Sequence, residues 1–484
     1  MIASECEPWA KTGGLGDVVD ALARALGHPA ADGTRRVDAP VDVFLPRYRA
    51  IAVPADAATT AVRVPDPVSP DGARDVSIVS VDADGYRLRL VDLPAAFDRD
   101  GYYGTTAGDH PDNAWRFGML CRSALETIRV EARPVDVVHV HDWQGAPAVL
   151  YRDAWYWGDF TLGRTAFVLT LHNPAYHGWT HAPDVWTLGL PGGFGDAFGL
   201  DILRTGIERA EMVNTVSPTF AREARTPEMG KGLDWALAGR GDRFVGILNG
   251  IDTAQWDPAT DAALPATYGP GSLAGKAACR AALARELGFD PAAPGPIAGA
   301  VGRLDPQKGF DLVADAAPGM VASGVRLVVL GSGDPAIADR LREAAALHPD
   351  SVAVRETFDR DLARRIYAGS DLFLMPSRFE PSGQSQMIAM RYGTPPVVRA
   401  TGGLADSVVD ADASPGQGTG WTFVEETGAA LAAAVARARA AFADPDRTRW
   451  DGVVARGMAH DWSWEAGPVA GYLEMYQRAI AARR

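Results

Sequence analysis

The 484-residue sequence is poor in cysteine. Its three cysteines, Cys6, Cys121 and Cys279, are far apart and form no CxxC pair. An odd number of widely spaced cysteines predicts neither a disulfide framework nor a cysteine metal site. We therefore expect a reducing, cytoplasmic location.

Long apolar runs are also missing. The longest alanine-rich stretch, residues 427–442, is interrupted by Arg437 and Arg439, so no transmembrane helix is predicted. The chain opens with Met-Ile-Ala-Ser-Glu, which has neither the basic nor the apolar part of a secretory signal. The sequence therefore predicts a soluble protein.

Positive charge is in deficit. The chain has 47 Lys and Arg against 61 Asp and Glu, a formal net charge of −14, and we find no local basic patch. Such a balance disfavours nucleic acid and anionic membranes as partners. The hydrophobic share of 47% and the charged share of 22% are ordinary for a folded protein. The length predicts two or three domains.

Short β-branched and apolar runs alternate with amphipathic helical stretches, which predicts parallel α/β sheets. The candidate strands are residues 41–45, 135–140, 166–171, 212–216, 244–248, 297–301, 325–330, 352–354, 372–375 and 396–398. The series runs twice, with a polar, proline-rich break at residues 249–271. Two α/β domains are therefore expected, with ligands beyond the carboxyl ends of the strands, in the cleft between the domains.

Four glycine-rich turns precede predicted helices. They are KTGGLGD at 11–17, GSG at 331–333, EPSG at 380–383 and TGG at 401–403. Glycine allows close approach of the backbone to a ligand, and a helix N-terminus favours an anion. Any single turn is explained as well by a tight bend, but the four together indicate a ligand with a diphosphate group.

One of these turns permits a different interpretation. Residues 331–336 read GSGDPA, which matches the GxGxxA form of the dinucleotide fingerprint and would indicate NAD. The fingerprint normally follows the first strand of its domain, whereas here the strand at 297–301 comes earlier, which disfavours NAD. The Walker pattern of a P-loop is absent from the sequence.

Two cations follow the strand at 297–301. Arg303 and Lys308 lie five residues apart in GRLDPQKG, residues 302–309. At the carboxyl end of a strand, an arginine fork and a lysine point charge would neutralise a diphosphate in place of a divalent metal. The alternative, two solvated surface cations, stays open at this point.

Polar residues also follow two other strands. Asp142 comes after VHVH and His172 after the run ending at Leu171, which are positions typical of ligand contacts. His139 and His141 share strand spacing, so a three-histidine metal site with His172 is an alternative. No carboxylate-rich or HExxH context supports a metal, and hydrogen bonding to a polyhydroxylated ligand suits Asp142 and His172 better.

Glu380 lies between the strand at 372–375 and a helix predicted to begin near Gly383. A carboxylate near a positive helix end is expected to be ionised and to face a developing cation or a hydroxyl. An ordinary helix-start charge is the alternative, and the local sequence does not separate the two.

Taken together, the motifs resemble bacterial glycogen synthases and plant starch synthases. The matching segments are KTGGLGDV (11–18), HDWQ (141–144), LHNPAY (171–176), VSPTFA (216–221), GILNGID (246–252), GRLDPQKG (302–309), PSRFEPSG (376–383) and TGGLAD (401–406). They occur in the family's order from residue 2 to about residue 475, and KTGGL and SRFEP are specific.

The resemblance implies the α/β GT-B fold, with two Rossmann-like domains whose parallel sheets face each other across a cleft. It implies an N-terminal, acceptor-binding domain at residues 1–245 and a C-terminal, nucleotide-sugar-binding domain at 246–463. A C-terminal helix, residues 464–484, would cross back to the N-terminal domain.

The resemblance also implies an activity. Glucose would be transferred from ADP-glucose to the non-reducing end of an α-1,4-glucan, with retention of the anomeric configuration. The family needs no metal, so we expect no metal and no cofactor. The expected partners are the nucleotide-sugar donor and the glucan acceptor, without nucleic acid or membrane.

Residue roles carry over one by one. Arg303 and Lys308 would neutralise the diphosphate, and Lys11 with the Gly14 amide would reach it from the N-terminal domain. Glu380 would hold the glucose and support an oxocarbenium-like transition state. The other implied contacts are His172 and Asp142 with sugar hydroxyls, Asn249 lining the site, Thr401, Gly402 and Gly403 meeting the donor, and Phe358 stacking on adenine in place of a usual tyrosine.

Two features near Glu380 bear on the reaction and on the donor: one is shared with the family, and the other is a departure from it. Eight residues after Glu380, where other retaining enzymes carry a second glutamate, the chain has Ile388, as the family also lacks that glutamate. A double displacement through an enzyme carboxylate is therefore not indicated, and a front-face reaction is the hypothesis. Ser382 and Gln384 replace residues usual in the family, so the donor preference is open.

Three alternatives remain beside a glucan synthase. A same-fold enzyme using UDP-glucose or a small acceptor is the nearest. A glucan phosphorylase would need pyridoxal phosphate on a lysine and a much longer chain. A non-catalytic glucan-binding module is the third, although intact Lys11, Arg303, Lys308 and Glu380 argue against it. The sequence gives no oligomeric state.

Overall fold

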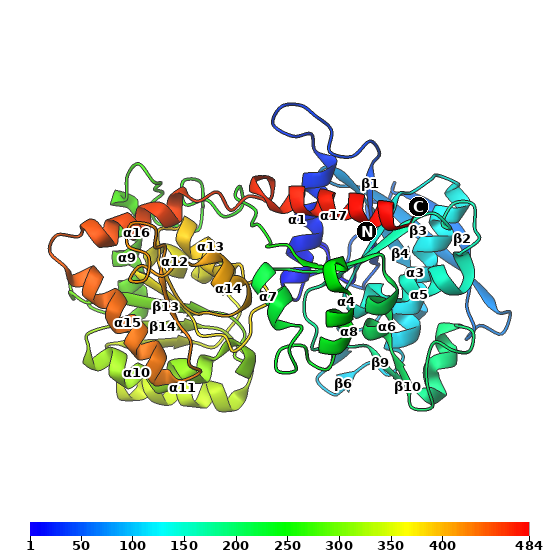
Figure 1. Ribbon diagram of the computed structural model, residues 1–484. Helices are drawn as coiled ribbons and strands as arrows, with labels where there is room; N and C mark the ends of the chain where they lie inside the picture. The colour runs from blue at the N-terminus through cyan, green and yellow to red at the C-terminus, as the bar shows by residue number, and fades with distance from the viewer. Residues whose placement is uncertain (484) are drawn as a thin grey trace. The chain divides into compact units, whose positions relative to one another are not determined.

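The computed structural model describes residues 1–483, which form two compact units. Unit 1 contains residues 1–216, residues 221–249 and the segment from Trp464 onward. Unit 2 contains residues 217–220 and 250–463. Figure 1 shows that each unit has a central sheet with helices packed on it.

The sheet of unit 1 has two groups of strands, in the orders β12-β11-β8-β7 and β1-β4-β3-β2. Ile2 joins them, because it bridges in parallel to Val140 of β7 and to Phe44 of β1. The strands are β1 (Val41–Pro46), β2 (Ala58–Pro65), β3 (Ala73–Asp82), β4 (Tyr86–Asp92), β7 (Val137–His141), β8 (Ala166–Leu171), β11 (Met212–Thr215) and β12 (Phe244–Gly246). β2 and β3 are antiparallel to their neighbours, and the other pairs are parallel.

Helices cover this sheet, and the C-terminal helix is one of them. The α-helices are α1 (Gly14–Gly27), α2 (Pro94–Phe97), α3 (Asn113–Glu131), α4 (Asp142–Gly145), α5 (Pro147–Tyr151), α6 (Ile202–Arg209), α8 (Asp234–Gly239) and α17 (Pro468–Arg483). A further helix, α7 (Pro218–Glu223), has its first three residues in unit 2 and the rest in unit 1. Short elements are two ribbons, β5 (Gly104–Thr105) with β6 (Gly108–Asp109) and β9 (Trp179–His181) with β10 (Gly199–Asp201), and the helical turns Arg152–Tyr156, Ala182–Leu188, Gly241–Arg243 and Trp464–Ala466. Tyr472 and Met475 of α17 pack with Leu22 of α1 and Val168 of β8 in one buried cluster.

Unit 2 has a six-stranded, fully parallel sheet in the order β15-β14-β13-β16-β17-β18. Its strands are β13 (Ile297–Val301), β14 (Arg326–Leu330), β15 (Val352–Arg355), β16 (Leu372–Met375), β17 (Pro396–Arg399) and β18 (Trp421–Phe423). From β13 the chain adds β14 and β15 on one side, and it then returns to the other side of β13, where it adds β16, β17 and β18. The strand order therefore reverses between β13 and β16. Ligands of open α/β sheets bind outside the carboxyl ends of the strands at such a reversal.

Helices lie on both faces of this sheet (Figure 1). They are α9 (Ala274–Leu287), α10 (Phe310–Ala322), α11 (Pro335–Leu347), α12 (Arg360–Gly369), α13 (Ser385–Arg391), α14 (Gly402–Ser407), α15 (Gly428–Ala443) and α16 (Thr448–Ala459), with a short turn at Pro306–Lys308. The core between α9, α12 and the sheet is apolar and includes Leu283, Phe289, Ile297, Val328 and Ile366.

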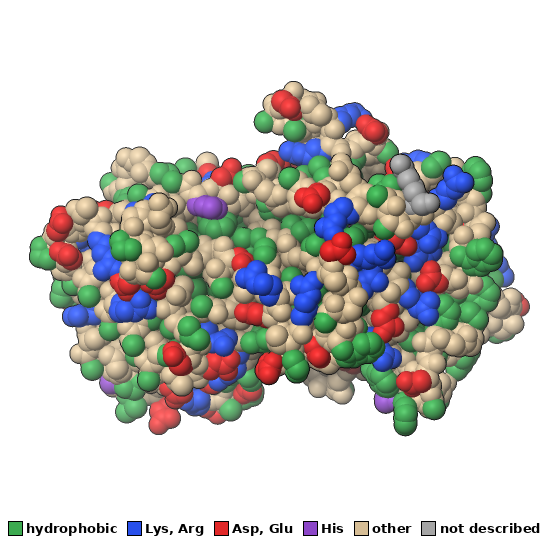
Figure 2. Space-filling model, viewed as in Figure 1, with side chains coloured by type: hydrophobic (Ala, Val, Ile, Leu, Met, Phe, Trp, Pro, Cys, Tyr) green, Lys and Arg blue, Asp and Glu red, His purple; other side chains and the backbone are tan. Residues whose placement is uncertain are grey.

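All ten strands predicted from apolar runs are present, with shifts of up to two residues at their ends. The helix expected near Gly383 begins at Ser385, because Gly383 has φ +69° and Gln384 serves as the N-cap. No helix formed by residues 1–483 combines the length and apolar character needed to cross a membrane. On the face shown in Figure 2, acidic and basic side chains are interspersed.

Candidate functional site

Two loops of unit 2 meet at the point where the strand order reverses. Residues 302–309 follow β13 and residues 376–383 follow β16. The amide of Arg378 donates to the carbonyl of Gln307 at 2.8 Å. Gly309 has φ +71°, and a Cβ there would lie 2.2 Å from the carbonyl oxygen of Pro376. Glycine is therefore required at this position for the loops to approach each other.

This approach brings Lys308 to Glu380. Nζ of Lys308 lies 2.6 Å from Oε2 of Glu380, which also accepts a hydrogen bond from the Ser377 hydroxyl at 3.1 Å. The Glu380 side chain is only 6% exposed. A buried carboxylate held by an ammonium and a hydroxyl is fixed in place, as a residue that must face a reacting centre needs to be.

Arg303 lies on the same loop but has a different environment. Its Nη1 atom is 3.1 Å from Oδ2 of Asp305, and its side chain is 60% exposed. Asp305 also accepts the amide hydrogen of Lys308 at 2.9 Å, so it organises the turn that carries Lys308. Arg303 thus has the freedom to reach an incoming anion, whereas Lys308 is already held.

The turn of Thr401, Gly402 and Gly403 packs directly on Glu380. The amide of Gly403 donates to the carbonyl of Glu380 at 3.0 Å. A Cβ on Gly402 would lie 2.0 Å from that carbonyl oxygen, and a Cβ on Gly403 would lie 2.0 Å from the carbonyl oxygen of Ser382. The structure therefore brings four predicted residues together: Glu380, Thr401, Gly402 and Gly403.

The GSG turn that resembles a dinucleotide fingerprint has a packing role. A Cβ on Gly331 would lie 1.9 Å from the carbonyl oxygen of Gly302, and one on Gly333 would lie 2.3 Å from that of Leu304. The amide of Leu304 donates to the carbonyl of Ser332 at 3.0 Å. These glycines support the loop that carries Arg303.

Phe358, the residue expected to stack on adenine, lies between β15 and α12. Its side chain is 80% exposed, and the Arg360 guanidinium carbon lies 6.0 Å from the ring centre. An exposed ring after a strand of this sheet has an open face for stacking.

In unit 1, the loop before α1 carries Lys11. Nζ of Lys11 lies 2.5 Å from Oδ1 of Asp17 and 3.7 Å from Oε2 of Glu7. Glu5, which the sequence analysis did not select, holds the loop through the amides of Thr12 and Gly13 at 2.6 and 3.2 Å. Its position just after the first parallel segment of the sheet was a signal that could have identified it.

Asp142 follows β7 and opens α4 with an unusual φ of +51°. Its Oδ1 atom accepts the amide of His172 at 2.7 Å and that of Asn173 at 3.4 Å. The structure thus brings Asp142 and His172 together. Burial raises the pKa of Asp142 to about 7.

His139, His141 and His172 lie close together, but their ring nitrogens contact one another or neighbouring hydroxyl groups. Nδ1 of His141 lies 3.0 Å from Nε2 of His172. His139 uses Nδ1 with the Tyr476 hydroxyl at 2.8 Å and Nε2 with the Thr170 hydroxyl at 2.5 Å. Burial lowers the pKa of His172 to about 3 and holds those of His139 and His141 well below their usual value. Across residues 1–483, no group of three or more His, Cys, Asp or Glu has a metal-binding arrangement.

Asn249 is the last residue of unit 1 before the chain enters unit 2. It is buried, and its side-chain oxygen has no hydrogen-bond partner among the described residues. Buried polar atoms are normally satisfied, so an unpaired amide oxygen is available to a ligand or water.

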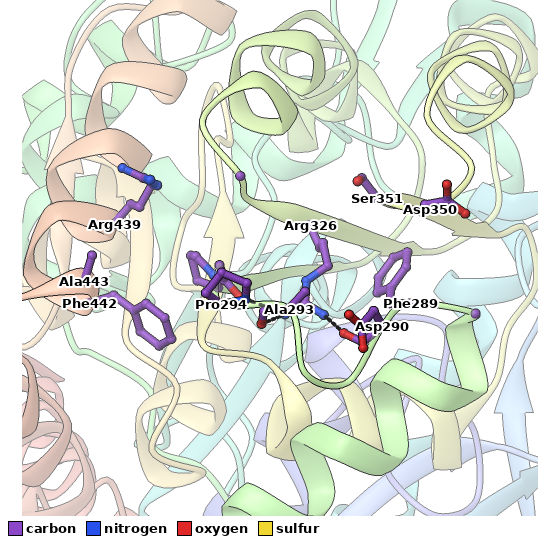
Figure 3. A pocket seen from close by; sticks show the side chains of 14 residues that line it. Phe289, Asp290, Ala293, Pro294, Arg326, Asp350, Ser351, Arg439, Phe442 and Ala443 are labelled. Atoms are coloured by element: carbon purple, nitrogen blue, oxygen red, sulfur yellow. Dashed lines mark hydrogen bonds between the residues drawn. The ribbon is translucent and has the colours of Figure 1, made fainter.

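A separate pocket of about 810 Å³ lies in unit 2 before the amino ends of β13, β14 and β15. Figure 3 shows Arg326 within it, donating to the carbonyls of Asp290 and Ala293, with the rings of Phe289 and Phe442 nearby. No predicted site residue lines this pocket. It is at the edge of the sheet opposite to the loop that carries Arg303.

Comparison with known proteins relates this arrangement to a family. Residues 1–239 match the starch synthase catalytic domain, and residues 295–440 match the group 1 glycosyl transferases. Glycogen synthase 2 of Geobacter sulfurreducens is 43% identical over 495 residues, covering 100% of this chain and 99% of that protein. Glycogen synthase of Anaeromyxobacter dehalogenans strain 2CP-C is 45% identical over 487 residues, covering 99% and 98%.

Solved structures agree. The catalytic domain of starch synthase IV from Arabidopsis thaliana, bound to ADP and acarbose, has a TM-score of 0.87 and 33% identity, with coverage of 99% of this chain and 98% of that one. Sucrose-phosphate synthase from Thermosynechococcus elongatus has a TM-score of 0.59 at 20% identity, which shows the fold alone.

The two α/β units, one with a mainly parallel and one with a fully parallel sheet, and these matches define a glycosyltransferase of the GT-B fold. Within that class, the chain belongs to the family of bacterial glycogen synthases and plant starch synthases. The fold and the family expected from the sequence motifs are thereby confirmed.

Proposed function

We propose that this enzyme transfers glucose from ADP-glucose to the non-reducing end of an α-1,4-glucan with retention of configuration. The relatives named glycogen synthase and the starch synthase bound to ADP and acarbose support this donor and this acceptor. The observation that carries the proposal is the contact of Lys308 with Glu380 beside the turn of Gly402 and Gly403.

The leaving group is a diphosphate, so its developing charge must be neutralised. Lys308 and the exposed Arg303 supply two positive charges after β13. Lys11 and the amide of Gly14, at the start of α1, supply a third charge and a helix N-terminus. These groups do the work of a divalent metal, so the proposed reaction uses no metal and no cofactor. Phe358 is proposed to stack on the adenine ring.

In the proposed step, the bond between C1 of glucose and the phosphate oxygen breaks as a bond from C1 to the acceptor O4 forms on the same face. The proton of the acceptor hydroxyl passes to an oxygen of the departing diphosphate. Glu380 faces the positive charge that develops at C1. The side chain eight residues later is the buried Ile388 in α13, so it supplies no second carboxylate.

The proposed sugar contacts come from unit 1 and from the turn before α14. Asp142 and His172 are proposed to bind hydroxyl groups, and Asn249 to use its unpaired amide oxygen in the same way. Thr401 and Gly402 would contact the donor beside Glu380. We further propose a cytoplasmic location, because all three cysteines are free and buried.

The test mixes the protein with glycogen and either ADP-glucose or UDP-glucose and measures the release of the nucleoside diphosphate. The Glu380→Ala variant is the inactive control. ADP release that is lost in the variant supports the proposal. A preference for UDP-glucose would instead assign a different donor and make Ser382 and Gln384, which precede α13, the first residues to substitute as its determinants. Glycogen binding without any nucleotide release would indicate a non-catalytic module.

A further inference from the structure

The Glu5 carboxylate makes an unusually complete set of contacts. Oε2 accepts the amides of Thr12 at 2.6 Å and Gly13 at 3.2 Å, and Oε1 accepts the Thr12 hydroxyl at 2.6 Å and the Tyr103 hydroxyl at 2.5 Å. The residue is only 3% exposed. Four donors directed at one buried carboxylate satisfy both of its oxygens and hold the side chain in one position.

These contacts lie at the start of α1. The N-cap residue is Gly13, which has an extended backbone and no side chain with which to cap the helix. Glu5, from outside the helix, accepts the amide hydrogen of this N-cap residue and that of Thr12 before it. The helix dipole favours a negative charge at this end, so the carboxylate and the helix stabilise each other.

The same loop carries two groups that the proposed function assigns to the donor. Lys11 directly precedes Thr12, whose amide and hydroxyl are both bound by Glu5, and Gly14 directly follows Gly13. The contacts therefore fix the two residues that lie between Lys11 and Gly14. Gly14 opens α1, where the first amides lie outside the helix's own hydrogen-bond ladder.

We propose that Glu5 is a positioning residue for the donor: by binding Thr12 and Gly13 it fixes the loop before α1 so that Lys11 and the Gly14 amide face the diphosphate. This inference rests on the proposed function. Glu5 does not itself touch the donor, because its two oxygens are occupied by the loop and by Tyr103. It also keeps the amides of Thr12 and Gly13 away from the anion, so that the diphosphate binds one residue further along.

The variant that tests this is Glu5→Gln, which has the same shape but presents an NH2 group to donors that need an acceptor. Asp66→Asn is the matched control. Asp66 is another buried carboxylate of unit 1, bound by the Val68 amide, Trp115 and Arg74, and it organises a turn after β2. Both variants lose a buried carboxylate, but only the first acts on the loop of Lys11.

Two measurements that do not depend on turnover come first. Hydrogen exchange of the peptide spanning residues 8–16 is expected to accelerate in Glu5→Gln and to stay unchanged in Asp66→Asn. The dissociation constants of ADP and of UDP are measured for wild type and both variants. For the nucleotide that binds wild type, the dissociation constant is expected to rise about tenfold in Glu5→Gln. A tenfold change corresponds to the loss of about one charge-assisted hydrogen bond. In turnover, the donor KM is expected to rise similarly while kcat and the glycogen KM stay within about twofold.

Unchanged exchange in Glu5→Gln would overturn the role of Glu5 in holding the loop, whatever the activity. Faster exchange with unchanged nucleotide binding would overturn its role toward the donor. Absence of glucose transfer by wild type would instead contradict the proposed function and leave the exchange and binding results readable. If Glu5→Gln does not fold, Glu5→Asp keeps the charge but shortens the reach, and it is expected to show both effects at smaller size.

Discussion

Nζ of Lys308 lies 2.6 Å from Oε2 of Glu380, although the two residues come from loops that follow different strands. The pair forms because β13 and β16 are neighbours where the strand order reverses, and because Gly309 lets the first loop approach Pro376. A lysine assigned to the diphosphate is thus fixed beside the carboxylate assigned to the sugar. This geometry matches a reaction in which charge separates between a phosphate and C1.

The charge of Glu380 is therefore expected to be needed for transfer and not for donor binding. Glu380→Gln keeps the size of the side chain but removes the charge that faces the developing cation. We expect the rate of transfer to fall by about a thousandfold, while the dissociation constant of ADP-glucose changes by less than about threefold. Turnover close to that of wild type would exclude the proposed role of Glu380.

Gly403 is expected to be intolerant of any side chain. Gly403→Ala would place a Cβ 2.0 Å from the carbonyl oxygen of Ser382, so the turn and the Glu380 loop must separate. We expect a lower melting temperature together with loss of nucleotide release. The matched control is Gly239→Ala in α8, where no atom lies within 4 Å of the new Cβ and stability should stay the same or increase slightly. Normal turnover in Gly403→Ala would show that this close contact is dispensable.

The sequence predicted the parallel framework because its buried strands are continuous apolar runs with polar turns after them. It did not predict β2, β3 and β4, which mix buried and more exposed positions and include several arginines and aspartates. β18, a strand of three residues, was also not predicted. Short or half-exposed strands depend on pairing with neighbours, which local sequence does not show.

The candidate site was predictable where a residue type at a strand end is chemically distinctive. Lys308, Glu380 and Asp142 were predicted in this way. The contact between Lys308 and Glu380 was not predictable, since it depends on the neighbouring positions of β13 and β16 in the sheet. Glu5 was missed because its partners come from a loop and from Tyr103, 98 residues away in the chain.

The buried Asp142 is expected to make stability depend on pH. Its pKa is about 7 in the folded protein, because burial penalises the charged form, against an ordinary value near 3.8. Between about pH 4 and pH 7 the unfolded chain has released this proton while the folded chain keeps it, so the contribution of Asp142 to the free energy of unfolding falls as pH rises. The effect is at most about 4 kcal/mol.

Asp142→Asn removes this ionisation and keeps an acceptor for the His172 amide. The variant should gain stability relative to wild type as pH rises from 4 to 7, measured by urea unfolding at a series of pH values. The His177–Asp201 pair also titrates, because its hydrogen bond raises the pKa of His177, but it is present in both proteins and cancels in the difference. A difference independent of pH would contradict the burial of a neutral carboxyl at Asp142.

Lysine occurs at only four positions, and Lys276 in unit 2 is half-buried, with its ammonium directed at four acceptors. Its Nζ donates to the carbonyls of Ala368, Ser370 and Tyr392 at 3.0 to 3.1 Å and to the Thr394 hydroxyl at 2.7 Å. These acceptors lie at the ends of α12 and α13 and before β16 and β17, so one ammonium joins four elements.

Lys276→Met keeps the length of the side chain but leaves these carbonyls without their shared donor. Because orphaned buried acceptors are costly, we expect the free energy of unfolding to fall by about 2 to 4 kcal/mol. Arg340→Met is the control, since its ion pair with Asp315 is exposed and should contribute no more than about 1 kcal/mol.

Burial lowers the pKa of Lys276 to about 8, so wild type should gain stability as pH rises from 8 toward 10.5. Lys276→Met should lack that gain, and equal urea midpoints for the two variants would refute the role of Lys276 as a structural donor.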